Sequence, residues 1–221
     1  MVTNGLLITD PGTYPHLLLA GTSGSGKTRS GLDFLPLQEH ANAHTVLLEE
    51  PTQAIEYLSQ LYEITQERFI MLRQAGVSTW GRLLGSVTGR EIDTHSLSHP
   101  SPGPRILAVM DEFANLADAL PQNQRKELWR SARMIAAEGR KAGVHLALAL
   151  QDPTHKSLDL RSRRNCLPLS FRVKDGDASR VILGAGGAEQ LPPRQFMTVM
   201  NQLLRGAAFA LVIGRLAAFW R

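Results

Sequence analysis

Short, largely apolar runs recur along the chain, and longer stretches with apolar positions at helical spacing separate them. The runs fall at residues 16–20, 44–48, 106–110, 144–150 and 167–173. Apolar residues at consecutive positions, rather than at every second one, are typical of parallel strands that are buried on both faces. We therefore predict that these runs form a buried, mostly parallel sheet.

The segments between the runs predict helices and one long loop. Residues 52–75 carry apolar side chains at helical spacing, and Thr52 is a suitable first residue. Residues 28–34 and 127–140 predict two further helices, whereas residues 77–103 are rich in Gly, Ser, His and Pro and predict a loop. Strands that alternate with helices indicate an α/β fold, with a mostly parallel central sheet flanked by helices.

Composition narrows the class of protein only a little. The chain has 221 residues, 43% of them hydrophobic, which is enough for one domain with a sizeable core. The net charge of +4 permits a polyanionic partner without requiring one. Cys166 is the only cysteine, which excludes a disulfide framework and fits a cytoplasmic location. We see no signal peptide, and the apolar residues 207–213 are too few to span a bilayer.

The clearest chemical motif directly follows the first predicted strand. It reads Gly21, Thr22, Ser23, Gly24, Ser25, Gly26, Lys27 and Thr28, and a predicted helix follows it. Glycines let the backbone N–H groups wrap around a polyphosphate, Lys27 can reach the β- and γ-phosphates, and the Thr28 hydroxyl can bind Mg²⁺. A flexible Gly/Ser turn is the alternative, but the preceding strand and following helix favour a phosphate-binding loop for ATP or GTP.

A pair of acids ends the strand predicted at residues 106–110. Asp111 is suited to hold Mg²⁺, and Glu112 to act as the general base that polarises the attacking water. An acidic turn after a strand is common in isolation, but together with the phosphate-binding loop the pair indicates nucleotide hydrolysis. Glu112 is the residue that distinguishes a hydrolase from a protein that only binds nucleotide.

The strand predicted at residues 144–150 ends in Gln151, an uncharged polar residue that can sense the γ-phosphate and help to place water. This signal is weak alone, because many strands end in Gln. His145, within the same strand, is more simply explained as a hydrogen-bonded core or edge histidine than as a ligand.

Blocks of the sequence resemble the FtsK/SpoIIIE DNA translocases in the order in which that family has them. The blocks are residues 16–28 around the phosphate-binding loop, residues 111–116 (Asp-Glu-Phe-Ala-Asn-Leu), residues 138–153, and residues 177–191, which begin Asp-Ala-Ser-Arg. The loop alone is unspecific, whereas the ordered set covers most of residues 5–200. The chain is therefore identified as similar to the motor domains of this family.

The resemblance implies a RecA-like P-loop core that uses ATP and Mg²⁺ and works as a homo-oligomeric ring, usually a hexamer, around double-stranded DNA. It also implies one motor domain over residues 1–221, with a lead-in at 1–15, the core at 16–200 and a strand or helix extension at 201–221. ATP would lie between subunits, and an arginine from one subunit would complete its neighbour's site. Arg180 is the first candidate for this arginine, and Arg164, or Arg161 beside it, is the second.

The chain also departs from the family pattern. The usual Asp-Pro-Lys motif is absent between Ser30 and Thr52, so we expect a narrower sheet or an exposed sheet edge. Asp152 replaces the usual Arg after the sensor Gln. We expect no preceding domain, no winged-helix domain and no membrane anchor, so that a membrane or full-length partner protein would recruit the chain.

Evidence for DNA in the sequence itself is indirect. Bases outnumber acids between Asp152 and Lys174, which fits sequence-nonspecific contact with phosphates but equally a solvated face or a subunit interface. The function expected from the resemblance is an ATP-dependent double-stranded DNA translocase. A protein-secretion ATPase of the same superfamily, or a nucleotide-binding accessory subunit without motor activity of its own, remains the alternative.

Overall fold

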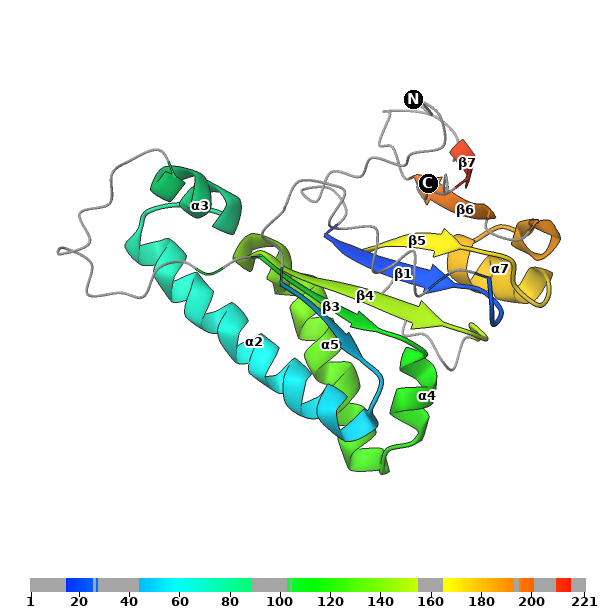
Figure 1. The fold of residues 1–221 in the computed structure, drawn as a ribbon, viewed down its shortest axis with the longest axis horizontal. Helices are drawn as coiled ribbons and strands as arrows, with labels where there is room; N and C mark the ends of the chain where they lie inside the picture. The colour runs from blue at the N-terminus through cyan, green and yellow to red at the C-terminus, as the bar shows by residue number, and fades with distance from the viewer. Residues whose placement is uncertain are drawn as a thin grey trace, which may run out of the picture.

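The computed structural model describes residues 15–25, 27, 44–88, 103, 105–154, 165–192, 195–200 and 210–215. Within them, a seven-stranded sheet forms the centre of the molecule (Figure 1). Its strands are β1 His16–Ala20, β2 His44–Leu48, β3 Ile106–Met110, β4 Val144–Leu150, β5 Cys166–Ser170, β6 Gln195–Met200 and β7 Ala210–Arg215. They lie in the order β2-β3-β4-β1-β5-β6-β7.

The strands from β2 to β5 in this order are parallel, and β6 and β7 continue the sheet with antiparallel pairing. Every residue of β1, β3, β4 and β5 is buried, which explains the consecutive apolar positions in the sequence. The strands predicted at residues 16–20, 44–48, 106–110 and 144–150 are confirmed.

The fifth strand prediction was shifted along the chain. We expected residues 167–173, but β5 ends at Ser170. Phe171 still donates its backbone N–H to the Ala20 carbonyl at 2.8 Å, after which the chain leaves the sheet. Phe171 and Val173 remain buried outside any strand, so their apolar character reflects burial rather than strand pairing.

Two long helices, α2 Pro51–Gln74 and α5 Gln122–Ala142, pack against each other on one face of the sheet (Figure 1). The shorter elements are α3 Trp80–Thr88, α4 Phe113–Asp118, α7 Gly176–Leu183 and the 3₁₀ turn η1 Ala188–Gln190. Helix α2 begins at Pro51 rather than Thr52, since proline lacks the N–H that has no partner in a first helical turn. Among the described helices, none combines the length and apolar character needed to cross a bilayer.

The loop predicted at residues 77–103 was wrong in part, because α3 lies within it, and α5 begins at Gln122, earlier than the predicted residue 127. Trp80 is buried among Leu72 and Leu83, and its indole N–H donates to the Gly103 carbonyl at 2.9 Å. The Arg68 guanidinium lies 4.1 Å from the centre of the indole ring. These tertiary contacts outweigh the Gly- and Ser-rich local composition.

The segment that lacks the Asp-Pro-Lys motif supplies β2, which pairs with β3 along its whole length. Within the described residues β2 forms that edge of the sheet, and the Leu47 side chain on it is 37% exposed. Most of the segment between Ser30 and Thr52 lies outside the described residues, so the expected narrower sheet or exposed edge stays a prediction.

Candidate nucleotide-binding site

The carboxyl ends of β1, β4 and β3 lie side by side at one edge of the sheet. Strand β4 is inserted between the other two, with Leu150 aligned with Ala20 of β1 and Leu148 aligned with Met110 of β3. The phosphate-binding loop after β1, Gln151 after β4 and the acids after β3 consequently meet at this edge. In parallel α/β sheets, ligands bind at the carboxyl ends of the strands.

The phosphate-binding loop is anchored to the strands on both sides of β1. The Gly21 N–H donates to the Leu150 carbonyl at 3.1 Å, toward β4. On the β5 side, the Thr22 N–H and hydroxyl both donate to the Arg172 carbonyl, at 2.8 and 3.2 Å. The loop then closes on itself through the Ser25 N–H and the Thr22 carbonyl, 3.2 Å apart. These bonds fix the loop directly against the sheet edge.

The Lys27 side chain is only 6% exposed and lies across this loop, where its ammonium donates to the Thr22 carbonyl at 3.2 Å. Burial lowers the pKa of Lys27 below the usual lysine value, and the negative charges of Asp111 and, less strongly, Glu112 act in the opposite direction. Lys27 and the two acids are therefore electrostatically coupled. Phosphate oxygens beside the ammonium would favour its charged form, as these carboxylates do.

Ser25 provides a separate test of whether the loop fits a polyphosphate. Its hydroxyl oxygen is buried and has no hydrogen-bond partner among the residues the structure describes. A buried hydroxyl without a partner is unfavourable, and a phosphate oxygen supplies an acceptor for it.

Of the predicted nucleotide-binding residues, Gly26 and Thr28 lie outside the described residues. The oxygens of Asp111 are the donor type that Mg²⁺ prefers.

Alanine in place of Gly21 is expected to distort the loop. Gly21 has φ +155°, and a Cβ there would lie 2.6 Å from the Ser25 hydroxyl oxygen and 2.8 Å from the Phe171 Cβ. We expect Gly21→Ala to destabilise the fold by about 1–3 kcal/mol and to weaken ATP binding. Gly24→Ala is the matched control, since its φ is +71° and a Cβ would meet nothing within 4 Å, so only backbone strain of about 1 kcal/mol is expected. Urea unfolding and ATPγS titration of both variants measure the difference, and equal losses would contradict this assignment.

Asp111 and Glu112 form a tight turn between β3 and α4. Glu112 has φ 51° and ψ 46°, the only positive φ of a non-glycine residue in the part of the chain that the structure describes. Its N–H donates to the Asp111 carboxylate at 3.1 Å, and its carboxylate accepts from the Asn115 side-chain amide at 2.6 Å. A left-handed non-glycine residue costs about 1–2 kcal/mol and is often found at functional sites.

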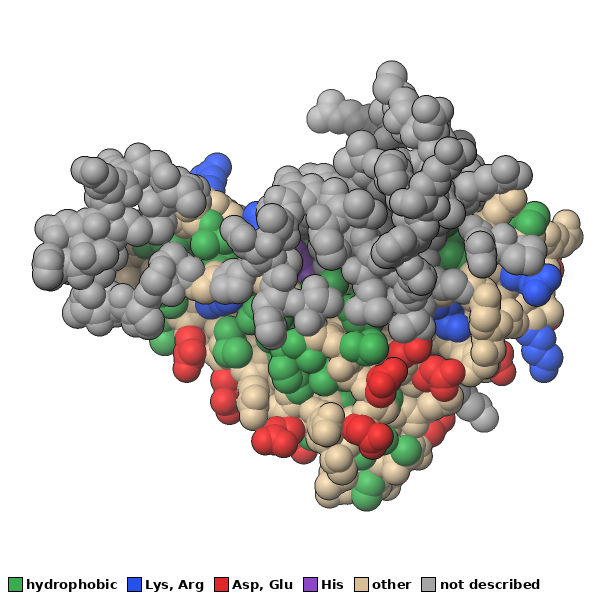
Figure 2. Space-filling model, in the orientation of Figure 1, with side chains coloured by type: hydrophobic (Ala, Val, Ile, Leu, Met, Phe, Trp, Pro, Cys, Tyr) green, Lys and Arg blue, Asp and Glu red, His purple; other side chains and the backbone are tan. Residues whose placement is uncertain are grey.

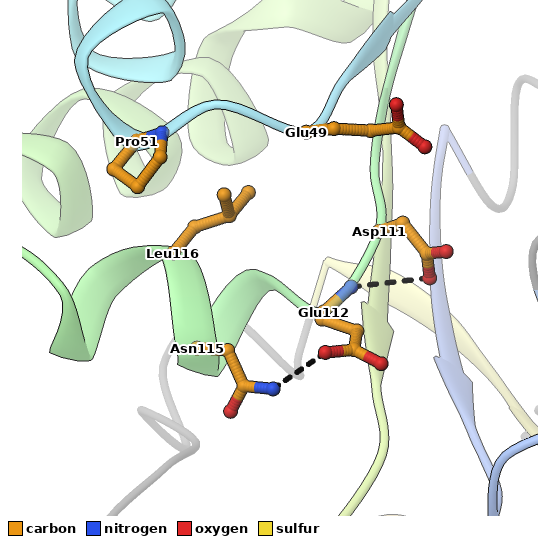
Figure 3. Close-up of a pocket in the computed structure, with 6 residues that line it drawn as sticks. All are labelled: Glu49, Pro51, Asp111, Glu112, Asn115 and Leu116. Carbon is orange, nitrogen blue, oxygen red and sulfur yellow. Dashed lines mark hydrogen bonds between the residues drawn. The ribbon is translucent and has the colours of Figure 1, made fainter.

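A pocket of about 330 Å³ opens beside this turn. Its lining residues are Glu49 after β2, Pro51 at the start of α2, Asp111 and Glu112 after β3, and Asn115 and Leu116 on α4. The carboxylates of Glu49, Asp111 and Glu112 lie on one side of it and Pro51 and Leu116 on the other, with Asn115 below Leu116 (Figure 3). The arrangement places carboxylates where they can hold a cation and accept a proton from water.

Sequence reasoning missed two polar residues of this pocket. Glu49 directly follows β2 just as Asp111 follows β3, and the register aligns Leu48 with Met110, so the two acids end neighbouring strands. The apolar run before Glu49 was the available signal. Asn115 lies three residues after Glu112, the spacing at which side chains in the first turn of a helix meet.

The other predicted site residues are distributed around the same sheet edge or beyond the described residues. Gln151 is half-buried and follows Leu150, whose carbonyl accepts from Gly21. Arg180 on α7 is exposed, pairs with Asp177, and does not line the pocket. Arg161 and Arg164 lie outside the described residues. His145 is buried at the opposite end of β4, with its Nδ1 2.7 Å from the Pro15 carbonyl oxygen, as expected of a hydrogen-bonded core histidine.

The sheet order, the loop after β1 and the acids after β3 together define the RecA-like class of P-loop ATPase domains. The model of the FtsK/SpoIIIE family matches residues 29–155, more than half of the sequence, and the chain therefore belongs to the FtsK/SpoIIIE family. The resemblance drawn from the ordered sequence blocks is confirmed.

Curated relatives agree with this assignment. The DNA translocase FtsK of Corynebacterium efficiens is 29% identical over 205 residues, which cover 80% of this chain and 21% of that protein. The DNA translocase FtsK of Treponema pallidum is 27% identical over an alignment of 230 residues, and the match covers 90% of this chain and 27% of that protein. The chain thus spans about a quarter of the length of these relatives.

Solved structures confirm the fold. The pCW3 conjugation coupling protein TcpA, in its monomer form with ATPγS, matches with a TM-score of 0.71 at 23% identity, over 94% of this chain and 62% of that one. The cytoplasmic domain of the type VII secretion ATPase EccC of Thermomonospora curvata matches with a TM-score of 0.63 at 22% identity, over 91% and 25%. The same architecture therefore occurs in proteins whose names refer to conjugation and to secretion.

Proposed function

We propose that the chain is an ATP-hydrolysing motor that moves double-stranded DNA in the cytoplasm as a homo-oligomeric ring. One observation carries the proposal: the phosphate-binding loop, the Asp111–Glu112 turn and Gln151 converge at a single sheet edge. The names of the FtsK relatives support DNA as the substrate. The family model supports the motor class.

In this proposal the loop and Lys27 hold the triphosphate. Loop N–H groups and the Lys27 ammonium bind the β- and γ-phosphate oxygens, and the ammonium exchanges its bond to the Thr22 carbonyl for bonds to phosphate. Thr28 and Asp111 would hold Mg²⁺, which neutralises charge that develops on the phosphates. The anchoring of the loop to β4 and β5 keeps these donors in place during the reaction.

Glu112 and Gln151 then act on water. The Glu112 carboxylate accepts a proton from the water that attacks the γ-phosphorus, and the Gln151 amide orients that water. The bond from phosphorus to the leaving oxygen breaks, and ADP and phosphate form. Glu112 follows β3 and Gln151 follows the adjacent β4, so each is held by a buried strand.

An arginine from a neighbouring subunit would complete the site. Arg180 is exposed on α7, in the family block that begins at Asp177, and it does not line the pocket of its own subunit. In the view of Figure 2, Asp and Glu side chains gather over α2 and α4, and Lys and Arg side chains lie both near α7 and near α3.

Arg180→Ala is expected to leave ATP binding intact and to lower hydrolysis about a thousandfold, the effect typical of an arginine that stabilises charge on the transferred phosphoryl group. Steady-state ATPase assays measure the change, and Arg130→Ala, at an exposed arginine on α5, is the control. Mixing Arg180→Ala with Glu112→Gln subunits should restore part of the activity, because some interfaces then combine an intact Glu112 with an intact Arg180. Failure of the mixture to recover would contradict action between subunits.

The proposed function is tested by ATP hydrolysis with and without linear double-stranded DNA, on protein of measured assembly state. We expect strong stimulation that declines with added salt, because contacts to phosphates release counterions. Arg172, whose carbonyl accepts from Thr22 of the phosphate-binding loop, and Lys174 are exposed and are candidate contacts to DNA phosphates. Binding of ATP without DNA-dependent turnover would instead favour a secretion ATPase or a nucleotide-binding accessory subunit.

A further inference from the structure

The Glu112 carboxylate has a specific polar neighbour that the mechanism above does not use. Asn115 is the third residue of α4, and its side-chain amide nitrogen lies 2.6 Å from one carboxylate oxygen of Glu112 (Figure 3). The hydrogen bond thus joins the residue before α4 to the first turn of that helix. A carboxylate has two oxygens, so one oxygen bound to Asn115 leaves the other available to accept a proton.

The Asn115 amide that donates this hydrogen bond is uncharged, which suits a neighbour of a general base. A lysine or arginine at this position would pair with the Glu112 charge and weaken its ability to take a proton. An amide fixes the side chain in place and leaves the negative charge. The Glu112 side chain makes no capping hydrogen bond to the backbone of α4, and the Asn115 amide is the group that donates to its carboxylate.

The first turn of α4 is itself held firmly. Phe113 is fully buried and packs edge-on against Trp129 of α5, with ring centres 4.7 Å apart, and Leu116 is 5% exposed. The Leu116 N–H donates to the Glu112 carbonyl at 3.0 Å. Asn115, although its own side chain is exposed, therefore extends from a backbone that neighbouring residues fix on both sides.

We infer that Asn115 is a positioning residue that orients the Glu112 carboxylate for proton transfer from water, an inference that rests on the proposed function. In this inference Asn115 acts through Glu112 and has no contact of its own with nucleotide or with the reacting water. The left-handed backbone at Glu112 directs its side chain toward α4, and the Asn115 amide then selects one orientation of the carboxylate. Loss of the amide permits other orientations, most of which do not face the water.

The first test is Asn115→Ala in the full chain. We expect kcat for ATP hydrolysis to fall about tenfold, the effect of losing one hydrogen bond to a charged group. ATPγS affinity and the thermal unfolding midpoint should stay unchanged, because Asn115 is exposed and its side-chain amide donates to Glu112, to which we assign a role in water activation rather than in nucleotide binding. Asn123→Ala is the matched control, since Asn123 is exposed in the first turn of α5 and does not line the pocket.

A double-mutant cycle separates positioning from a structural role. Glu112→Asp shortens the side chain by one methylene and removes the carboxylate from the reach of Asn115. Adding Asn115→Ala to Glu112→Asp should then change the residual kcat little, whereas a structural role predicts the same loss in both backgrounds. An equal loss in both backgrounds, or an unchanged kcat in Asn115→Ala, would overturn the inference while the proposed function stands. An unaltered protein that binds ATPγS but shows no turnover would contradict the proposed function and this inference with it.

Discussion

Replacing Lys27 with alanine is expected to weaken ATP binding by at least about a hundredfold, because a buried ammonium that binds phosphate oxygens contributes about 3 kcal/mol. Lys27 is 6% exposed, and its ammonium already lies within the phosphate-binding loop, where it donates to the Thr22 carbonyl. The fold should survive, since alanine removes the unfavourable burial of a charge. Isothermal titration with ATPγS, accompanied by thermal unfolding, measures both quantities.

Lys126→Ala is the control for this prediction. Lys126 is exposed on α5 and does not line the pocket, so ATPγS affinity should not change. Lys27→Arg tests shape, because guanidinium keeps the charge but is planar and broader than the ammonium that fits the loop. Full-strength binding by Lys27→Ala would mean that the loop does not hold the triphosphate in the way proposed.

Replacing Glu112 with glutamine is expected to keep ATP binding and to lower hydrolysis by at least about a hundredfold, the usual contribution of a general base. Glutamine has nearly the shape of glutamate, and its carbonyl oxygen can still accept from the Asn115 amide. It cannot accept a proton from water at neutral pH. Phosphate release and ATPγS titration on the same preparation measure turnover and binding separately.

Glu127→Gln is the matched control, since Glu127 is exposed on α5 and its loss should leave kcat unchanged. Glu49→Gln tests specificity within the pocket, where Glu49 also supplies a carboxylate. If Glu49→Gln lowers kcat as much as Glu112→Gln does, the assignment of the general base to Glu112 is not supported. Undiminished hydrolysis in Glu112→Gln would exclude the proposed general base.

Much of the sheet could be predicted because parallel strands that are buried on both faces leave an unmistakable pattern. The four runs that became β1, β2, β3 and β4 had their bounds correct from sequence. The fifth was misplaced because Phe171 and Val173 are buried without being in a strand. Helix α3 was missed because its stability derives from burial of Trp80 against α2, which local composition does not reveal.

The residues of the candidate site likewise fall into those that could be predicted from sequence and those that could not. The residues of the phosphate-binding loop follow one another directly in the sequence, and so do Asp111 and Glu112. Each group could therefore be identified from its local spacing. Glu49 was missed because it belongs to no recognisable motif, and Asn115 because its place in the family block at residues 111–116 gave it no chemical role. Glu49 reaches the pocket only through the pairing of β2 with β3, and Asn115 only because the turn at Glu112 directs the carboxylate toward α4.

The sequence by itself determined the class of fold and the family, and it supplied the residues that we propose to bind phosphate and activate water, because these depend on local pattern and on motifs with a fixed chemistry. The tertiary structure alone decided that β4 lies between β1 and β3. This order brings the phosphate-binding loop, Gln151 and the two acids Asp111 and Glu112 to one edge of the sheet. It also decided which polar side chains surround Glu112. Strand order and side-chain orientation depend on contacts between residues far apart in the chain, and no local spacing encodes those contacts.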